Sequence, residues 1–346
     1  MPTSPSTLRD LVIRAVQAGG GKIRSVCSAV PRELVEGFGL DVRRMLAPGT
    51  VASESHGESL SSPSVCAWCK SALGSAEAGL LWVGAATCDQ MRRSLELAGR
   101  KSGSAAIVIH APKTRTPEAE ELYRDELVWL AGELERRTGR RLEPDSLRRS
   151  IRTRNAIRSK VRSLRSTLSG SDFVALVHLD AMLPAAEMAA FLESHAFGHS
   201  SRPGLPVVVA GSPLAPGDLR WLDLLESSGF SLVADVTCTG DRAVDFDVDE
   251  HGEPLEALSH AYHRRPPCIF IRPNDEFYDY ANDLARVRGA RAVIWRSVRG
   301  CDLYSLESQR AEARLGLQFL ALDMSYGDVD SPRVRTRVEA FAESLR

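Results

Sequence analysis

The chain has 346 residues, more than the ~150 of a typical domain, so two α/β-sized domains or one large domain are expected. Its 43% hydrophobic and 26% charged residues are ordinary for a globular protein and exclude disordered and fibrous classes. The formal net charge of −1 provides no overall attraction to nucleic acid or to a membrane surface, so neither is an expected partner.

No apolar run reaches the ~20 residues that cross a bilayer, and the segment 1–10 is polar. A cytoplasmic location is therefore expected.

Eight short apolar runs are predicted to be β-strands, with helical or loop-like segments between them. They lie at 79–85, 105–110, 172–179, 205–210, 230–236, 267–271, 290–295 and 317–322. Continuous apolar strands that alternate with helices are typical of buried parallel sheets, which predicts an α/β fold.

A long Glu- and Arg-rich segment, 117–168, separates two groups of strands and is predicted to form two or three exposed helices. The run 200–206 contains two prolines and a glycine and favours a domain boundary. We predict a first α/β domain at 1–200, with an N-terminal helix and the helical insertion, and a second α/β domain at 201–346. Both domains are expected to have a parallel sheet of the Rossmann or flavodoxin type.

Seven cysteines are a high number for a reducing compartment, where thiols more often bind metal or perform redox chemistry than form disulfides. Cys88, Cys238 and Cys301 each follow a predicted strand within a few residues. The carboxyl ends of parallel strands are where α/β proteins bind ligands and cofactors. Three cysteines in equivalent positions therefore favour a cofactor site over buried small hydrophobic residues, which is the interpretation retained for Cys268.

Cys66 and Cys69 form a Cys-Ala-Trp-Cys pair, and Lys70 follows it with a charge that favours thiolate. Thiolates from separate loops suit an iron–sulfur cluster or zinc. Zinc is less favoured, because neither a second Cys-x-x-Cys nor a His pair lies nearby in the sequence.

Several motifs together resemble the subunits of 2-hydroxyacyl-CoA dehydratases and benzoyl-CoA reductases. They cover nearly the whole chain in that family's order, at 27–39, 66–74, 87–93, 134–139, 155–158, 211–214, 235–242, 300–302 and 334–341. The resemblance implies two α/β domains with a [4Fe–4S] cluster between them, held by Cys66, Cys88 and Cys301.

The resemblance also implies a function. An ATP-dependent iron–sulfur activator delivers one electron, and a ketyl radical of the 2-hydroxyacyl thioester then expels its hydroxyl group. Implied partners are the acyl-CoA substrate, the activator, and a second homologous subunit or a second copy.

Two features of the cysteine set leave alternatives open. Cys69 stands where another residue type is expected, so it is a candidate fourth ligand, which would favour electron transfer over direct substrate binding. Cys27 and Cys238 make a larger, double-cubane cluster a further alternative. The remaining alternatives are a benzoyl-CoA-reductase-like enzyme and a non-catalytic scaffold subunit.

Ser28, Glu54 and His56 are the polar residues nearest to the first two motifs and are the predicted groups for substrate contact or proton transfer. The segment 136–165 has twelve basic residues against two acidic ones. It is interpreted as a solvated helical face, with binding of coenzyme A phosphates or of an acidic activator as the alternative.

Overall fold

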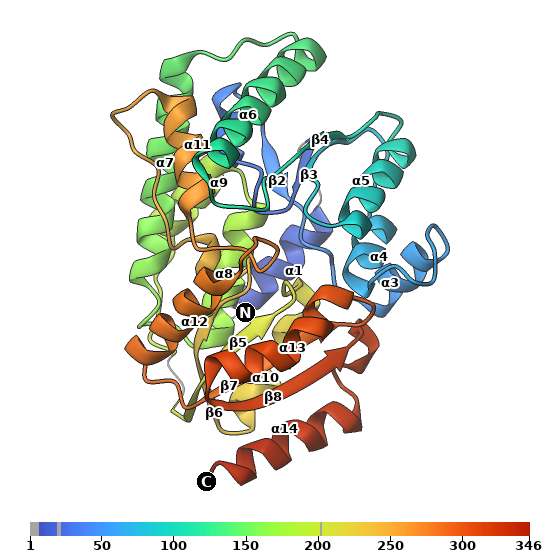
Figure 1. Ribbon diagram of the computed structural model, residues 1–346, viewed down its shortest axis with the longest axis vertical. Coiled ribbons are helices and arrows are strands. Elements are labelled where there is room, and N and C mark those ends of the chain that lie inside the picture. The colour runs from blue at the N-terminus through green and yellow to red at the C-terminus, as the bar shows by residue number, and fades with distance from the viewer. Residues whose placement is uncertain (1–6, 19–21, 201–202) are drawn as a thin grey trace, which may run out of the picture.

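The computed structural model describes residues 7–18, 22–200 and 203–346, which form two four-stranded parallel sheets surrounded by helices. The first sheet and its helices occupy the upper part of Figure 1, and the second sheet occupies the lower part. The predicted α/β fold with two parallel sheets of the Rossmann or flavodoxin type is confirmed.

The two sheets have the same strand order. The first runs β2-β1-β3-β4, with β1 at Ile23–Val26, β2 at Val42–Arg44, β3 at Leu81–Ala85 and β4 at Ile107–Ile109. The second runs β6-β5-β7-β8, with β5 at Leu205–Gly211, β6 at Phe230–Asp235, β7 at Ala292–Val298 and β8 at Gln318–Met324. The connections therefore change direction between the neighbouring strands β1 and β3 in the first sheet, and between β5 and β7 in the second. In open α/β sheets, ligands bind at such a point, outside the carboxyl ends of the strands.

Helices cover both faces of the first sheet. One face shares a hydrophobic core with α2 (Arg32–Gly37), α6 (Pro117–Thr138), α7 (Pro144–Ser163) and α11 (Pro254–Arg264). The other face packs on α4 (Ala67–Gly74) and α5 (Asp89–Lys101), and α3 (Val51–Glu58) lies against α4.

The second sheet is covered in the same way. One face packs on α1 (Leu8–Ala18), α8 (Gly170–Met182), α9 (Ala185–Ser194), α10 (Leu219–Ser227) and α14 (Pro332–Ser344). The other face packs on α12 (Asp275–Val287) and α13 (Asp302–Leu315). Short 3₁₀ helices lie at Pro216–Asp218, Asp241–Ala243 and Tyr326–Asp328.

Six of the eight predicted strands are confirmed, and two predictions are wrong. Residues 172–179 belong to the helix α8, which begins after the capping residue Ser169 and is buried on nearly every side, so its apolar run carries no helical periodicity. Residues 267–271 form a loop after Pro266 and Pro267, which have no N–H to donate to a sheet. The short strands β1 and β2 were not predicted, because arginines interrupt their apolar residues.

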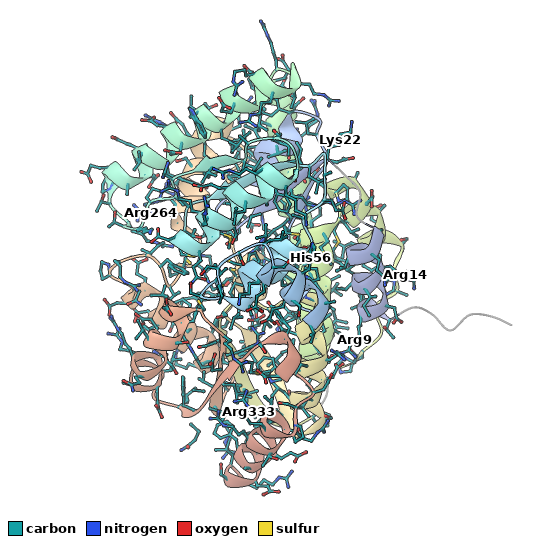
Figure 2. All side chains as sticks on the ribbon, turned by 90° about the vertical axis from the view of Figure 1, so that its right-hand side faces the viewer. Arg9, Arg14, Lys22, His56, Arg264 and Arg333 are labelled. Carbon is teal, nitrogen blue, oxygen red and sulfur yellow. The ribbon has the colours of Figure 1, made fainter. Side chains whose placement is uncertain are left out.

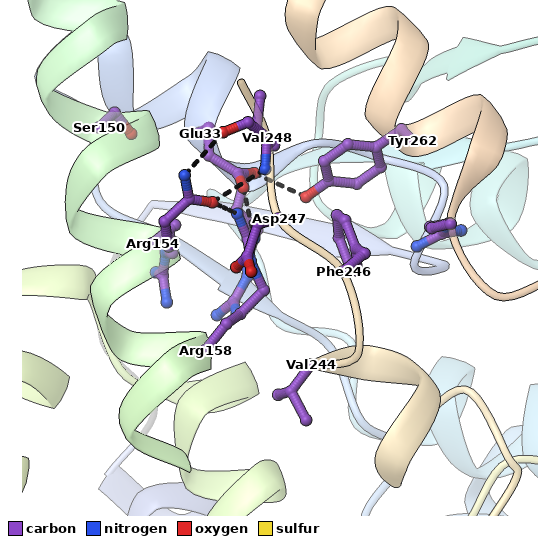
Figure 3. A network of polar contacts seen from close by, with 12 residues as sticks. Glu33, Ser150, Arg154, Arg158, Val244, Phe246, Asp247, Val248 and Tyr262 are labelled. Atoms are coloured by element: carbon purple, nitrogen blue, oxygen red, sulfur yellow. Dashed lines mark hydrogen bonds and ion pairs between the residues drawn. The ribbon is translucent and has the colours of Figure 1, made fainter. Parts of the chain in front are cut away.

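The predicted helices of 117–168 are present as α6 and α7, but the interpretation of the basic segment as a solvated face is wrong for its inward side. Arg158 is buried and donates to the fully buried Glu33 at 2.6 Å, and the hydroxyl of Tyr262 donates to the same carboxylate at 2.6 Å (Figure 3). Burial raises the pKa of Glu33, but the Arg158 guanidinium outweighs this effect and holds it below its ordinary value.

A second set of ion pairs continues this network along α7. The guanidinium of Arg154 is buried between the carboxylates of Glu36 and Asp180, and Arg32 donates to Asp180 at 2.8 Å. The three arginines and three carboxylates of the two sets balance in charge. The positive charges of α7 therefore serve to fix this helix on α2 and α8.

The division at residue 200 stays a prediction, and residues 201 and 202 lie outside the described part of the chain. Packing crosses that point in both directions. The helices α8 and α9 share the core of the second sheet, whereas α11, from the second half of the chain, packs against α6. Among the described residues, no helix is long and apolar enough to cross a membrane.

Candidate functional site: a cysteine-lined cavity between the sheets

Cysteines follow three of the four strands at which the sheets reverse direction. In the first sheet, Cys27 comes directly after β1 and Cys88 follows β3. In the second sheet, Ser212 follows β5 and Cys301 follows β7. Parallel strands place these loops at their carboxyl ends, so each sheet contributes the edge at which α/β proteins bind ligands.

The two edges meet at one cavity, and all seven cysteines line it. Its wall also contains Trp68, Met91, Phe270 and Tyr304, but no carboxylate or imidazole of the described residues. The cysteines are Cys27, Cys66, Cys69, Cys88, Cys238, Cys268 and Cys301. Because the described lining supplies sulfur ligands without acidic or imidazole ones, the site suits soft metals and iron–sulfur clusters.

Gln90 connects three of the cysteine loops. Its side-chain oxygen accepts from the backbone N–H of Cys66 at 2.7 Å, and its amide nitrogen donates to the carbonyl of Gly300 at 3.1 Å. Cys88 precedes Gln90 by two residues, and its sulfur accepts from the backbone N–H of Met91 at the start of α5. One side chain thus holds together loops that are far apart in the sequence.

Gly300 brings its loop unusually close to Cys66. It has a φ of +79°, and a Cβ at this position would lie 3.1 Å from the Cα of Cys66. The backbone N–H of Ala67 donates to the carbonyl of Arg299 at 3.0 Å, which fixes the same approach. A glycine is required here both for its backbone conformation and for the space.

Cys66 and Cys69 interact directly at the N-terminal end of α4. The thiol of Cys69 donates to the Cys66 sulfur, which lowers the pKa of Cys66 and raises that of Cys69 well above its usual range. The Lys70 ammonium also lowers the pKa of Cys66. Cys66 is therefore the thiol of this pair that ionises first.

The thiols of Cys88 and Cys301, the two other proposed ligands, are neutral at ordinary pH. Burial raises the pKa of Cys88, and it raises the pKa of Cys301 to about 12. A buried thiolate in this cavity needs a positive counter-charge, and a metal centre supplies one, so binding of metal would release protons.

Cys27, Cys238 and Cys268 form a second group of thiols in the same cavity. Burial and the other two cysteines raise the pKa of Cys27. Arg44 donates to the carbonyl of Cys238 at 2.7 Å and to its sulfur at 3.3 Å. Cys27 has a φ of 75° and is the only residue other than glycine with positive φ in the described part of the chain. Such strained backbone occurs most often at functional sites.

The structure brings Ser28 to this site. Ser28 lines the cysteine cavity, and its hydroxyl accepts from Nη2 of Arg265 at 3.1 Å. Its backbone carbonyl also accepts from Arg265.

Glu54 and His56 do not line the cavity. Glu54 accepts from the backbone N–H of Tyr326 at 3.2 Å, and His56 lies 3.2 Å from the ammonium of Lys101. Figure 2 shows His56 on the exposed helix α3. Their predicted role has no geometric support in this arrangement and stays a prediction.

Cys66, Cys88, Cys301 and the predicted fourth ligand Cys69 do share the cavity wall. Within the described residues, no three Cys, His, Asp or Glu side chains are grouped closely enough to hold a single metal ion. The thiolates of a four-iron cluster bind different iron atoms, so they border a cavity and do not surround one point. The four cysteines fit such a cluster by their chemistry and by their shared wall.

Sequence reasoning missed three features of this site. Cys268 lies in a half-buried loop on the cavity and not in a buried strand. Gln90 was unremarkable within its motif, because its two hydrogen bonds join loops that only the folded chain brings together. Cys27 directly follows the short strand β1, and because that strand was not predicted, its place at a strand end was not recognised.

The family model for the D-component of 2-hydroxyglutaryl-CoA dehydratase matches residues 27–345. The chain belongs to this family. The predicted relationship to 2-hydroxyacyl-CoA dehydratases and benzoyl-CoA reductases is therefore confirmed.

One similar protein is a putative dehydratase subunit, and another is a reductase subunit. The chain is 24% identical over 291 residues to the putative dehydratase subunit YjiM of Escherichia coli K12, covering 77% of this chain and 74% of that protein. It is 23% identical over 351 residues to a subunit of the benzoyl-CoA reductase of Thauera aromatica, covering 92% of this chain and 89% of that protein. Family membership thus supports an enzyme of the dehydratase and reductase group that acts on acyl-CoA.

Solved structures give only a weak likeness. The laminin-binding adhesin of Streptococcus agalactiae aligns with a TM-score of 0.23 and 12% identity, covering 94% of this chain and 100% of the adhesin. ZnuA aligns with a TM-score of 0.22 and 13% identity, covering 94% and 98%. Similarity at this level carries no argument about the site.

Proposed function

We propose that this protein is the iron–sulfur subunit of an enzyme of the 2-hydroxyacyl-CoA dehydratase type, a lyase. The observation that carries the proposal is the meeting of Cys66, Cys88 and Cys301, from the ends of two sheets, at one cavity lined by sulfur ligands. Family membership supplies the substrate class, a 2-hydroxyacyl thioester of coenzyme A.

Cys66, Cys88 and Cys301 are the proposed ligands of a [4Fe–4S] cluster, and Cys69 is the candidate fourth ligand. When bound, the cluster would pass one electron to the thioester carbonyl, so that the ketyl radical expels the 2-hydroxyl group. The net elimination of water would be redox-neutral, because the electron supplied for it would be recovered once the β-proton has been lost.

The chain's own residues prepare this chemistry. Trp68, Met91, Phe270 and Tyr304 supply an apolar wall that excludes water from the cavity. Ser28, whose hydroxyl accepts from Arg265 and which lines this cavity, is the hydroxyl group that we propose for hydrogen-bonding to the substrate.

Two protein partners belong to the proposal. An ATP-dependent iron–sulfur activator would deliver the electron, because the elimination needs an electron of low potential. A second homologous subunit, or a second copy of this chain, would complete the enzyme. The cytoplasm is the proposed location, since it supplies ATP and a reducing environment.

A second candidate function is favoured by one specific observation. Cys27, Cys238 and Cys268 line the same cavity as the other four thiols, and Arg44 donates to the Cys238 sulfur. A set of seven thiols favours a larger cluster of the double-cubane kind and a reductase without water elimination. A further alternative is a benzoyl-CoA-reductase-like enzyme that has the single [4Fe–4S] cluster and transfers electrons without eliminating water.

The proposed test is anaerobic purification, with measurement of iron and acid-labile sulfide and EPR of the dithionite-reduced protein. We expect about four irons per chain for one [4Fe–4S] cluster. Cys66→Ser and Cys301→Ser should lose the cluster, whereas Cys238→Ser should keep it and serves as the matched cysteine control. Retention in Cys69→Ser would leave one iron open to the substrate.

Different results would assign different functions. About eight irons, lost in Cys238→Ser as well, would favour the larger cluster and the reductase. Protein without iron under strict anaerobiosis would contradict both enzymatic functions and leave a scaffold subunit.

A further inference from the structure

The three proposed cluster ligands share one position in the fold, directly before a helix. Cys66 is the N-cap residue of α4, Cys88 is that of α5, and Cys301 is that of α13. These helices have 8, 13 and 14 residues. The first N–H groups of a helix have no partner within it, so three sets of donors begin at the wall of one cavity.

Backbone N–H groups of the first helical turns hydrogen-bond to the three sulfurs. Met91 donates to the Cys88 sulfur at 3.3 Å, and the N–H of Tyr304 donates to the Cys301 sulfur. The Cys66 sulfur accepts from N–H groups of the first turn of α4. Each helix N-terminus also carries about half a positive charge. The arrangement therefore favours negative charge on all three sulfurs.

Ser212 adds a side-chain donor to this set. It lies directly after β5, lines the cysteine cavity and is only 1% exposed. Its hydroxyl oxygen accepts from the backbone N–H of Val298 at 3.0 Å, and the hydroxyl also donates to the Cys301 sulfur. Because Val298 supplies the proton of the first contact, the proton of Ser212 is available for the sulfur.

The backbone around Ser212 holds this hydroxyl in place. The N–H of Ser212 donates to the carbonyl of Arg296 at 2.8 Å. Gly211 has a φ of +109°, and a Cβ at this position would lie 2.1 Å from the same carbonyl oxygen. Only a glycine allows this close approach of the two strand ends. The motif 211–214, which has no other role in the proposed function, thus fixes a donor beside Cys301.

Cationic side chains do not replace these donors. In the described part of the chain, the lining of the cavity contains one cation, Arg44, and it donates to the carbonyl and the sulfur of Cys238. Lys70 acts on Cys66. Negative charge at the other two proposed ligands is therefore stabilised by N–H and O–H donors.

We propose that Ser212 and the N-terminal turns of α4, α5 and α13 stabilise the reduced cluster and so raise its reduction potential. One electron from the activator adds one negative charge, and no bond is formed or broken. Hydrogen bonds to the sulfurs are among the factors that set the potential of a cluster. The inference rests on the proposed function, and Ser212 is a positioning residue in it, because it acts through Cys301.

The test is an EPR-monitored redox titration of the anaerobically purified protein, with iron content measured for each variant. Ser212→Ala should shift the midpoint potential to more negative values. We expect a roughly tenfold change in the ratio of reduced to oxidised cluster, which is about 59 mV for one electron. Ser212→Thr keeps the hydroxyl and should stay close to wild type. Ser259→Ala, which removes a buried hydroxyl outside the cavity lining, is the matched control and should leave the potential unchanged.

A second variant tests a helix end without changing a buried side chain. Asp302 is the exposed first residue of α13, directly after Cys301, and its carboxylate partly cancels the positive end of that helix. Asp302→Asn should therefore shift the potential to less negative values. A shift of Ser212→Ala and Asp302→Asn in the same direction would contradict the inference. If Ser212→Ala binds no iron, an unchanged potential in Asp302→Asn would overturn it.

Iron content separates this inference from the proposed function. Equal iron and equal potentials in wild type and Ser212→Ala would overturn the inference alone. Wild-type protein without iron would overturn the proposed function, and this inference with it.

Discussion

The side-chain oxygen of Gln90 accepts a hydrogen bond from the backbone N–H of Cys66 at 2.7 Å, and the same amide donates to Gly300. The two contacts connect the loop before α4, the start of α5 and the loop after β7. The cavity is therefore held by a residue that is not itself a proposed ligand.

We predict that Gln90→Ala weakens retention of the cluster, because it removes both hydrogen bonds between the cysteine loops. Each such bond contributes about 0.5–1.5 kcal/mol to stability. The expected result is fewer irons per chain after gel filtration with an iron chelator. Gln90→Glu, which keeps the acceptor and loses the donor, should give an intermediate iron content, and an unchanged content in Gln90→Ala would contradict the positioning role.

The backbone strain at Cys27 can be tested by substitution, which shows whether the fold tolerates an unfavourable φ in order to keep a thiol at this position. Since its φ of 75° is unfavourable for a residue with a Cβ, Cys27→Gly should stabilise the metal-free protein by about 0.5–1 kcal/mol. Cys27→Ser keeps the strain and should not be stabilised. The midpoint of urea unfolding measures both variants, and a lower midpoint for Cys27→Gly would show that the thiol itself stabilises the fold.

Removing only one partner of the buried ion pair between Arg158 and Glu33 should lower the free energy of unfolding strongly. We predict that Arg158→Met destabilises the protein by about 3–5 kcal/mol, because it leaves a buried carboxylate without its cation. The double variant with Glu33→Gln should recover much of that loss, since the carboxylate that Arg158 neutralised is then no longer charged. Thermal unfolding of both variants checks this, and equal destabilisation would mean that the pair acts through packing alone.

Asp235 should make stability depend on pH. Burial raises the pKa of this carboxyl to about 7, and its Oδ2 atom has no hydrogen-bond partner. Because the folded pKa lies above the unfolded one, the neutral acid contributes stability that is fully present below about pH 4 and is lost as the pH rises through 7.

Asp235→Asn removes that titration. The variant should gain stability relative to wild type between pH 5 and 8, on the order of 1–4 kcal/mol at the upper end. Unfolding midpoints at several pH values measure the difference. A difference that does not change with pH would show that Asp235 is not the titrating group.

Some parts of the fold follow directly from local patterns. The strands β5 to β8 and the helices α6 and α7 are long or strongly patterned, so their residues alone predict them. The helix α8 was assigned to a strand because burial on nearly every side removes the polar face that makes a helix recognisable. The loop 267–271 was assigned to a strand because its residues are apolar, although Pro266 and Pro267 have no N–H to pair in a sheet.

Local patterns were enough to establish the α/β class, the two groups of parallel strands and the cysteines that follow them, since these depend on neighbouring residues and short spacings. The folded chain was needed to show that all seven thiols share one cavity, that the arginines of α7 neutralise buried carboxylates, and that Glu54 and His56 lie away from the site. Most of these facts depend on contacts between residues far apart in the chain. Such contacts arise from the packing of one sheet's edge against the other, which no local pattern encodes.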